Sequence, residues 1–293
     1  MNLRTLLRGT GVAIVTPFND DETVDFESLG KLIDFTIGNG VEYIVSLGTT
    51  GETPTLDKQE KLEIAHYTFE KVNGRAPVVV GIGGNNTKEV VKAVQEFPLE
   101  KAAAILSAAP YYNKPSQEGL FQHYKAIAEA APRPVILYNV PGRTGRNMEA
   151  STTLKLAHEV NNIAGIKEAG NSVSQCMQIL KERPADFLVV SGDDDLVLPE
   201  LAAGIDGVIS VAANCFPKNF SAMVRAGLSG DFKKAVELNN PLIEAYNLLF
   251  AENNPAGVKA FLYELGLIKN VVRLPVVPLS KGVHDKVKTY LQQ

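Results

Sequence analysis

The sequence predicts an α/β fold, a (β/α)8 TIM barrel with a C-terminal helical appendage. Short apolar runs that resemble strands recur at intervals of roughly 30 residues through the first two thirds of the chain, and charged segments with helical periodicity separate them. Each strand run is almost entirely apolar rather than alternating, as a parallel sheet buried on both faces requires. An open, doubly wound sheet is the main alternative for the same alternation.

Eight runs supply the expected strands. They are Val12–Thr16, Tyr43–Leu47, Val78–Ile82, Ala103–Ser107, Val135–Asn139, Ala164–Lys167, Phe187–Ser191 and Gly207–Val211. Helices expected between them include Phe26–Asn39, Asp57–Val72, Lys88–Phe97, Gln117–Ala130 and Ser151–His158. Residues that can cap a helix N-terminus stand at their starts, namely Asp25, Asp57, Thr87, Ser116 and Ser151.

After Val211 the strand pattern stops. Four helices are expected there with no strand between them: Pro217–Leu228, Asp231–Phe250, Pro255–Leu265 and His284–Leu291. One of them should close the barrel and the others should form the appendage. The predicted domains are therefore a barrel over residues 1–230 and a helical domain over residues 231–293.

Composition excludes several classes of protein. The net charge is −4, and no run rich in Lys or Arg would hold a polyanion, so we expect no nucleic acid partner. No stretch approaches the roughly 20 apolar residues that span a bilayer, so we expect no membrane partner. The segment Met1–Phe18 lacks the apolar core and cleavage site of a signal peptide, and the expected compartment is cytoplasmic.

The sequence also gives no sign of a metal or a cofactor. Cys176 and Cys215 stand apart without metal-ligand spacing, and none of the four histidines lies with a Cys, Asp or Glu at zinc spacing. The stretch Gly81-Ile82-Gly83-Gly84 lacks the spacing of a dinucleotide-binding loop, and no phosphate-binding P-loop motif occurs.

Polar residues follow several strands at their C-terminal ends, where a parallel barrel carries its active site. Lys167 ends the sixth strand after an apolar run, a position where burial lowers the pKa of an amine and leaves it neutral enough to attack a ketone. The resulting iminium is an electron sink from which an enamine can form and add to an aldehyde. The alternative is a structural lysine paired with Glu168 or another carboxylate at the rim of the barrel.

Tyr138 ends the preceding strand, and neighbouring strands lie about 5 Å apart, so its phenol can reach a substrate beside Lys167. Such a phenol can relay protons if a hydroxyl chain assists, and Thr50 and Tyr112 could supply that chain. The alternative is a core tyrosine whose hydroxyl is bonded to the backbone.

Two features could bind carboxylates. Gly48-Thr49-Thr50-Gly51 offers hydroxyls and backbone N–H groups in a tight turn that can surround an anion. Arg143, in a glycine-flanked loop, could hold a second carboxylate bidentately. Each has an ordinary alternative, a common Gly/Thr turn and a solvated surface arginine.

These motifs together resemble the pyruvate-dependent class I aldolase superfamily and, within it, the dihydrodipicolinate synthase family. The resemblance spans nearly the whole chain, and several long motifs in order are more specific than any single one. They are Gly48-Thr49-Thr50-Gly51-Glu52, Pro110-Tyr111-Tyr112-Asn113-Lys114-Pro115-Ser116-Gln117-Glu118-Gly119, Tyr138-Asn139-Val140-Pro141-Gly142-Arg143-Thr144-Gly145, Gly165-Ile166-Lys167-Glu168-Ala169 and Ser191-Gly192-Asp193-Asp194.

The resemblance implies a lyase that condenses pyruvate with L-aspartate 4-semialdehyde to 4-hydroxy-tetrahydrodipicolinate, in lysine and diaminopimelate biosynthesis. It implies that Lys167 forms the Schiff base, that Tyr138, Thr50 and Tyr112 relay protons, and that Tyr112 comes from a neighbouring subunit of a homotetramer, a dimer of dimers. The remaining implied contacts are the amides of Thr49 and Thr50 for the pyruvate carboxylate, Arg143 for that of the semialdehyde, and backbone atoms of Gly192 and Ile209.

Other readings stay open at this point. A sugar-acid aldolase or an N-acetylneuraminate lyase would share the lysine and the tyrosine, and a catalytically silent barrel would share only the fold. The resemblance also suggests inhibition by lysine at a subunit interface, at positions that hold Asn85, Glu89 and Tyr111 here. Lys58 and Lys61 stand beside them where relatives often have histidine, and like-charge repulsion would weaken binding of a cationic effector.

Overall fold

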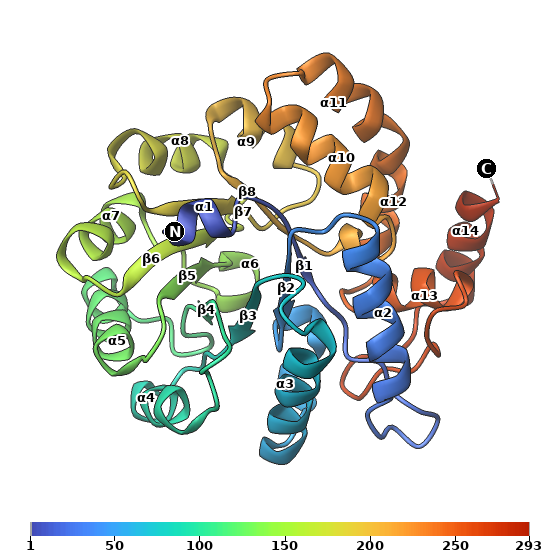
Figure 1. Ribbon diagram of the computed structural model, residues 1–293, viewed down its shortest axis with the longest axis horizontal. Coiled ribbons are helices and arrows are strands. Elements are labelled where there is room, and N and C mark those ends of the chain that lie inside the picture. Colours follow the sequence, from blue (N-terminus) through green and yellow to red (C-terminus); the bar gives the residue numbers. More distant parts are fainter. Residues whose placement is uncertain (1, 293) are drawn as a thin grey trace.

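The computed structural model describes residues 2–292 and contains one closed barrel, with the strands in the order β1 to β8 (Figure 1). All neighbouring strands are parallel, including β8 with β1. The predicted barrel is therefore confirmed, and the open sheet is excluded. The strands are β1 Gly9–Ala13, β2 Tyr43–Ser46, β3 Val78–Gly81, β4 Ala104–Ala108, β5 Val135–Asn139, β6 Ile163–Glu168, β7 Leu188–Ser191 and β8 Gly207–Ser210.

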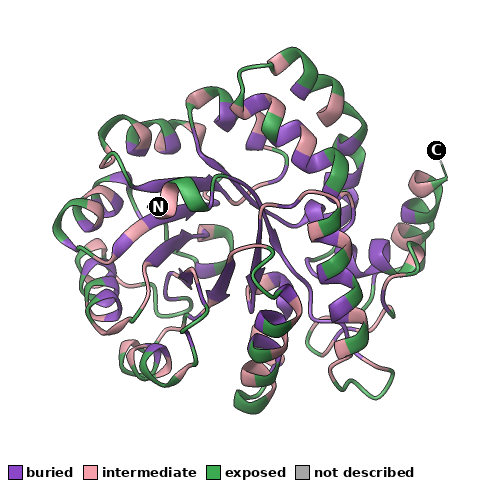
Figure 2. Ribbon diagram, in the orientation of Figure 1, coloured by how far each residue is buried: buried purple, intermediate pink, exposed green. Residues whose placement is uncertain are grey.

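Helices surround the barrel, with their buried faces toward the strands and their exposed faces outward (Figure 2). This segregation follows from their amphipathic sequences. The helices are α1 Leu3–Leu6, α2 Phe26–Gly38, α3 Lys58–Val72, α4 Thr87–Glu96, α5 Gln117–Ala130, α6 Pro141–Thr144, α7 Ala150–Glu159, α8 Val173–Glu182, α9 Val197–Ala203, α10 Pro217–Leu228, α11 Phe232–Asn239, α12 Ile243–Phe250, α13 Ala256–Glu264 and α14 Lys281–Leu291.

The first strand begins earlier than predicted. It runs from Gly9 rather than Val12, because pairing on both sides overrides the weak strand preference of its glycines. Gly11 pairs with Tyr43 on β2 and Ile209 on β8. A Cβ atom on Gly11 would lie 2.1 Å from the Tyr43 ring, so only glycine fits this position.

Two of the predicted helix caps are wrong. Asp25, Asp57 and Ser116 cap α2, α3 and α5 as expected, each accepting a hydrogen bond from a backbone N–H of the first turn. The cap of α4 is Asn86 rather than Thr87. Ser151 lies inside α7, which begins one residue earlier and lacks a side-chain cap.

The predicted long helix after residue 231 is also wrong. It breaks at Pro241 into α11, a 3-10 turn over Asn240–Leu242, and α12, because proline has no N–H to continue the helix. The preceding helix, α10, packs on β1 and α9 and closes the ring of barrel helices. The domain boundary at residues 230 and 231 stays a prediction, and the apolar core continues across it through Ala235 and Leu242.

The barrel interior is filled with side chains below its C-terminal end. Tyr43, Leu188 and Ile209 are fully buried there. The short helix α1 lies over the opposite end of the barrel (Figure 1), and Leu7, which follows it, is fully buried in the same interior cluster. In the part of the chain that the structure describes, these side chains fill the barrel below the end at which the strands finish.

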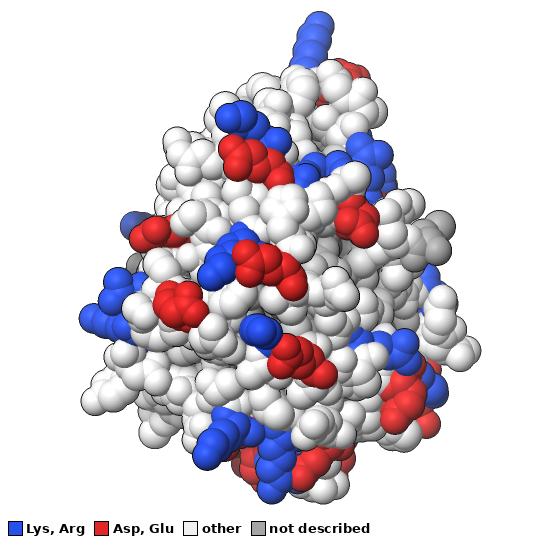
Figure 3. Space-filling view, turned by 90° about the vertical axis from the view of Figure 1, so that its left-hand side faces the viewer, with Lys and Arg blue, Asp and Glu red and all other residues white. Residues whose placement is uncertain are grey.

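The surface carries mixed charge. On the face seen in Figure 3, lysines and arginines lie among aspartates and glutamates rather than in a patch of one sign. Among residues 2–292, no helix is long and apolar enough to cross a membrane.

Candidate active site

Lys167 and Tyr138 lie side by side at the C-terminal end of the barrel. They are direct register partners on β6 and β5, and the Lys167 Nζ lies 4.5 Å from the centroid of the Tyr138 ring. Their exposed fractions are only 5% and 7%. Lys167 forms no ion pair within residues 2–292, and Glu168 instead accepts hydrogen bonds from Asn139 and Gln175. The alternative of a rim lysine paired with Glu168 or another carboxylate is therefore wrong.

Both side chains line a cavity that the predicted turn also borders. Its other walls come from strand ends, from the loops that follow them, and from α12 and the loop after α12. The lining residues are Ala13, Val45, Gly48, Thr49, Thr50, Leu106, Tyr138, Val140, Arg143, Lys167, Ala169, Gly192, Asp193, Val211, Phe250 and Asn254. Six of the predicted site residues, Lys167, Tyr138, Thr49, Thr50, Arg143 and Gly192, thus meet at one place.

The turn after β2 presents unpaired donors to this cavity. Thr49–Gly51 forms a 3-10 turn, in which the first N–H groups have no partner within the turn. The amides of Thr49 and Thr50 donate to no acceptor in the part of the chain that the structure describes. Two such amides at the start of one turn can donate to a ligand that accepts hydrogen bonds, such as an anion.

Asn254 links two of the candidate groups. Its side-chain Nδ2 donates to the Thr50 Oγ1 at 3.1 Å, and its backbone oxygen accepts from the Arg143 guanidinium at 3.4 Å. Because Thr50 accepts from Asn254, its own hydroxyl proton is free to point elsewhere in the cavity. The Oδ1 of Asn254 is buried and has no hydrogen-bond partner among the described residues, so it can accept a bond from a ligand.

Gly192 and Asp193 close the cavity beside the lysine. A Cβ atom on Gly192 would lie 2.5 Å from the Cβ of Ala169 and 2.9 Å from the Cε of Lys167, so the lysine chain occupies the space that a side chain would need. Burial raises the pKa of the Asp193 carboxyl to about 6, and the charge of Lys167 opposes that rise.

Two predicted residues lie away from this cavity. Ile209 belongs to the buried layer beneath it, and Val211, two residues further along the chain, forms the wall. Tyr112 is absent from the cavity lining, and its side chain is 89% exposed. It has φ = 73°, a backbone conformation that is strained for an aromatic residue.

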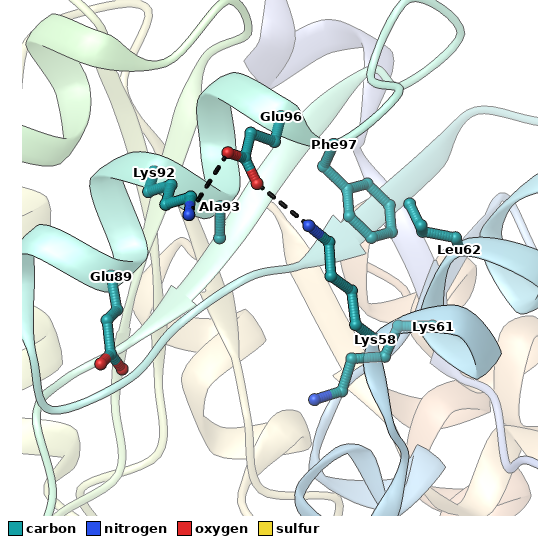
Figure 4. Close-up of a pocket in the computed structure, with 8 residues that line it drawn as sticks. All are labelled: Lys58, Lys61, Leu62, Glu89, Lys92, Ala93, Glu96 and Phe97. Atoms are coloured by element: carbon teal, nitrogen blue, oxygen red, sulfur yellow. Dashed lines mark hydrogen bonds and ion pairs between the residues drawn. The ribbon is translucent and has the colours of Figure 1, made fainter.

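The positions implied for regulation lie on a different surface. Asn85 donates to the backbone oxygen of Tyr111 at 3.2 Å, and Tyr111 is half exposed. Glu89 borders a groove between α3 and α4 that also contains Lys58 and Lys61 (Figure 4). In this groove Lys58 and Lys92 both approach Glu96, at 3.1 and 3.7 Å, over a floor formed by Leu62, Ala93 and Phe97.

Buried carboxylates lie behind the cavity. Burial raises the pKa values of Glu168 and Glu200 to about 7 each. Bonds from Gln175 and Asn139 oppose the rise at Glu168, whereas one oxygen of Glu200 has no partner among residues 2–292. No group of three or more His, Cys, Asp or Glu side chains in the described chain is arranged to hold a metal ion.

Comparison with known proteins identifies the family to which this site belongs. The model of the dihydrodipicolinate synthetase family matches residues 6–293. The chain belongs to that family. The 4-hydroxy-tetrahydrodipicolinate synthase of Parabacteroides distasonis is 50% identical over 287 residues, which are 98% of this chain and 97% of that protein.

Two solved structures of the family are similar throughout. The chloride-inhibited dihydrodipicolinate synthase of Acinetobacter baumannii, complexed with pyruvate, has a TM-score of 0.95 and 41% identity, covering 98% of each chain. The enzyme of Cyanidioschyzon merolae with lysine bound has a TM-score of 0.94 and 34% identity, again covering 98% of each chain.

Family membership confirms the predicted fold and the predicted enzyme class, a lyase of the class I aldolase type. It also confirms the predicted function, condensation of pyruvate with L-aspartate 4-semialdehyde in lysine and diaminopimelate biosynthesis. The individual roles of the site residues stay predictions.

The sequence interpretation missed Asn254 and gave Asp193 no role. Asp193 follows the seventh strand, and its position alone could have marked it. Asn254 comes from the loop between α12 and α13, outside the predicted barrel, so no strand-end rule applies to it. A polar Asn-Pro pair between two apolar helical segments was the only signal.

Proposed function

We propose that Lys167 is the nucleophile of the condensation and that the cavity beside it binds pyruvate. The Lys167 Nζ attacks C2 of pyruvate and water leaves, which gives an iminium. Loss of a C3 proton then gives an enamine. The juxtaposition of a buried lysine, a register-paired tyrosine and unpaired turn amides is the observation that carries this proposal.

The turn amides give the substrate its orientation. If the amides of Thr49 and Thr50 hold the pyruvate carboxylate, the ketone carbon one bond away is presented to Lys167 across the same cavity. Tyr138 is the nearest phenol to that amine, and we assign it the proton transfers, with the free hydroxyl proton of Thr50 as its partner.

The aldehyde substrate then binds nearer the opening. Arg143 is exposed at the cavity wall and offers a guanidinium to its carboxylate. The enamine carbon attacks the aldehyde, and the substrate's own amino group then attacks the iminium carbon. That second attack releases Lys167 and closes the ring of the product.

The exposed Tyr112 supports an oligomeric enzyme. A strained aromatic residue that is 89% exposed in one chain is better explained if another copy buries it. We therefore propose a homotetramer, a dimer of dimers, in which Tyr112 reaches the cavity of a neighbouring copy. We also propose a cytoplasmic location, which the two free, buried cysteines fit.

The decisive experiment traps the intermediate. The protein is incubated with pyruvate and borohydride, and its intact mass and peptide map are measured. An adduct on Lys167, absent in Lys167→Ala, is expected. A folded protein with no adduct at Lys167 would contradict the mechanism. Turnover with aspartate semialdehyde but not with sugar aldehydes separates the synthase from a sugar-acid aldolase of the same chemistry.

Inhibition by L-lysine is a separate hypothesis. The groove between α3 and α4 has three lysines and two glutamates, and two of the lysines already approach Glu96. The ammonium group of free lysine would meet the charges of Lys58 and Lys61 there. The hypothesis of inhibition predicts a saturable fall in rate as L-lysine is added, and a rate that stays flat would contradict it.

A further inference from the structure

A buried ion pair joins the carboxylate-binding turn to the helices that follow the barrel. The Oε1 of Glu52 lies 2.5 Å from the Nζ of Lys259 on α13, and their side chains are 2% and 0% exposed. Glu52 is the residue that ends the Thr49–Gly51 turn. The buried charge of Lys259 therefore contacts the residue at the end of the turn that borders the cavity.

Both members of the pair are held by further contacts. The other oxygen of Glu52 accepts from the backbone N–H of Arg273 at 3.0 Å. Lys259 donates to the backbone oxygen of Val271 at 2.9 Å and lies 4.0 Å from the centroid of the Phe18 ring. Each member of the pair thus has a second contact besides the ion pair.

The turn itself is strained. Leu47 and Glu52, on either side of it, have φ values of 58° and 53°, in the left-handed region that residues other than glycine seldom adopt. Such a backbone persists only when its surroundings fix it. Asn254, in the loop just before α13, adds a second tie through its bond to Thr50.

A buried pair of this kind is a poor means of stabilising a fold, because apolar residues of the same volume serve as well. It does fix one geometry at the expense of others. We infer that Lys259 acts through Glu52 as a positioning residue, which orients the Thr49–Thr50 amides toward the carboxylate of the 2-oxo acid. The helices after the barrel then help to set the affinity for that substrate. This inference rests on the proposed role of the turn.

The test compares Lys259→Met, the double variant Glu52→Gln/Lys259→Met, and Arg183→Met. The double variant leaves no unpaired buried charge, so it can be measured in place of Lys259→Met if that single variant does not fold. Arg183 pairs with Asp206 at the far end of the barrel, with side-chain exposures of 9% and 5%, and Asp206 also pairs with Arg4. Arg183→Met is therefore the control for loss of a buried cation away from the cavity. Trapping with borohydride over a range of pyruvate concentrations gives the half-saturating concentration and the maximal rate, and a melting curve gives stability.

We expect the half-saturating pyruvate concentration to rise about tenfold or more in the Lys259 variants, the effect of losing one aligned bond to a charged group. The maximal trapping rate should change much less. Arg183→Met should lose stability and keep the wild-type half-saturation. A folded Lys259 variant with wild-type half-saturation would overturn the inference, as would an equal rise in Arg183→Met. Absence of any adduct in the wild type would instead overturn the proposed function.

Discussion

Replacing Gly192 by alanine should impair formation of the Schiff base. The new methyl group would lie 2.9 Å from the Cε of Lys167, whereas carbon atoms in ordinary contact are about 3.5–4.0 Å apart. The lysine chain must therefore move by roughly 0.6–1.1 Å, and a misplacement of about 1 Å costs on the order of 100-fold in rate. We expect trapping of pyruvate to slow by about that factor.

The same methyl group also meets the Cβ of Ala169 at 2.5 Å, so part of the clash is with the barrel itself. Overpacking of this kind costs about 1–3 kcal/mol, and we expect the melting temperature to fall by roughly 2–10 °C. Rates are measured as adduct mass against time at saturating pyruvate. Gly142→Ala is the control, because no heavy atom lies within 4 Å of its added Cβ. A folded Gly192→Ala that traps pyruvate at the wild-type rate would refute the reasoning.

Three further predictions follow from the site. Arg143→Met should raise the KM for the semialdehyde by about tenfold or more and leave pyruvate trapping unchanged, and a rise in both would contradict its assigned role. If Tyr112 acts in the site of a neighbouring copy, refolding an equal mixture of the inactive variants Tyr112→Phe and Lys167→Ala should restore activity. Half of the dimers are then mixed, and each mixed dimer has one intact site of two, so about a quarter of the wild-type activity is expected. No recovery would place Tyr112 within its own subunit. Finally, Glu200→Gln should stabilise the protein at pH 8 by at most about 3 kcal/mol and have no effect near pH 4. The pKa of Glu200 in the folded state is about 7, above the ordinary value of 4.5. Ionisation of Glu200 therefore lowers the stability of the wild type only as the pH rises through that range. An equal gain in melting temperature at both pH values would show that the charge is not the cause.

The barrel and most of its cavity could be predicted from the sequence, because each depends on local patterns. Apolar runs mark buried parallel strands, and polar residues at their ends meet at one edge whatever the details of packing. The positions of Lys167 and Tyr138 at that edge follow from the rule, whereas their assigned roles also needed the neighbouring motifs. The start of β1 could not be predicted, because Gly9 and Gly11 are in a strand only through their partners on β2 and β8.

The contacts that the C-terminal helices make with the cavity could not be predicted from local sequence patterns. Lys259 lies in a helix with apolar neighbours on all sides, and only the folded chain shows that its charge meets Glu52. Asn254 likewise approaches Thr50 across more than half of the sequence. Prediction from local sequence patterns assigns such residues to a separate appendage, because no neighbouring residue in the sequence indicates the contact.

Within residues 2–292, the filled interior and the cover formed by α1 and Leu7 close the lower end of the barrel, so the cavity opens at the end where the strands finish. Lys167 is buried within it and Arg143 is exposed at its wall. With the roles proposed above for these two residues, both substrates would pass the same opening in a fixed order. The keto acid would then have to arrive first, and the product would have to depart before another keto acid could follow. An aldehyde that occupies Arg143 too early would block the way, and excess semialdehyde would thus slow the enzyme that consumes it.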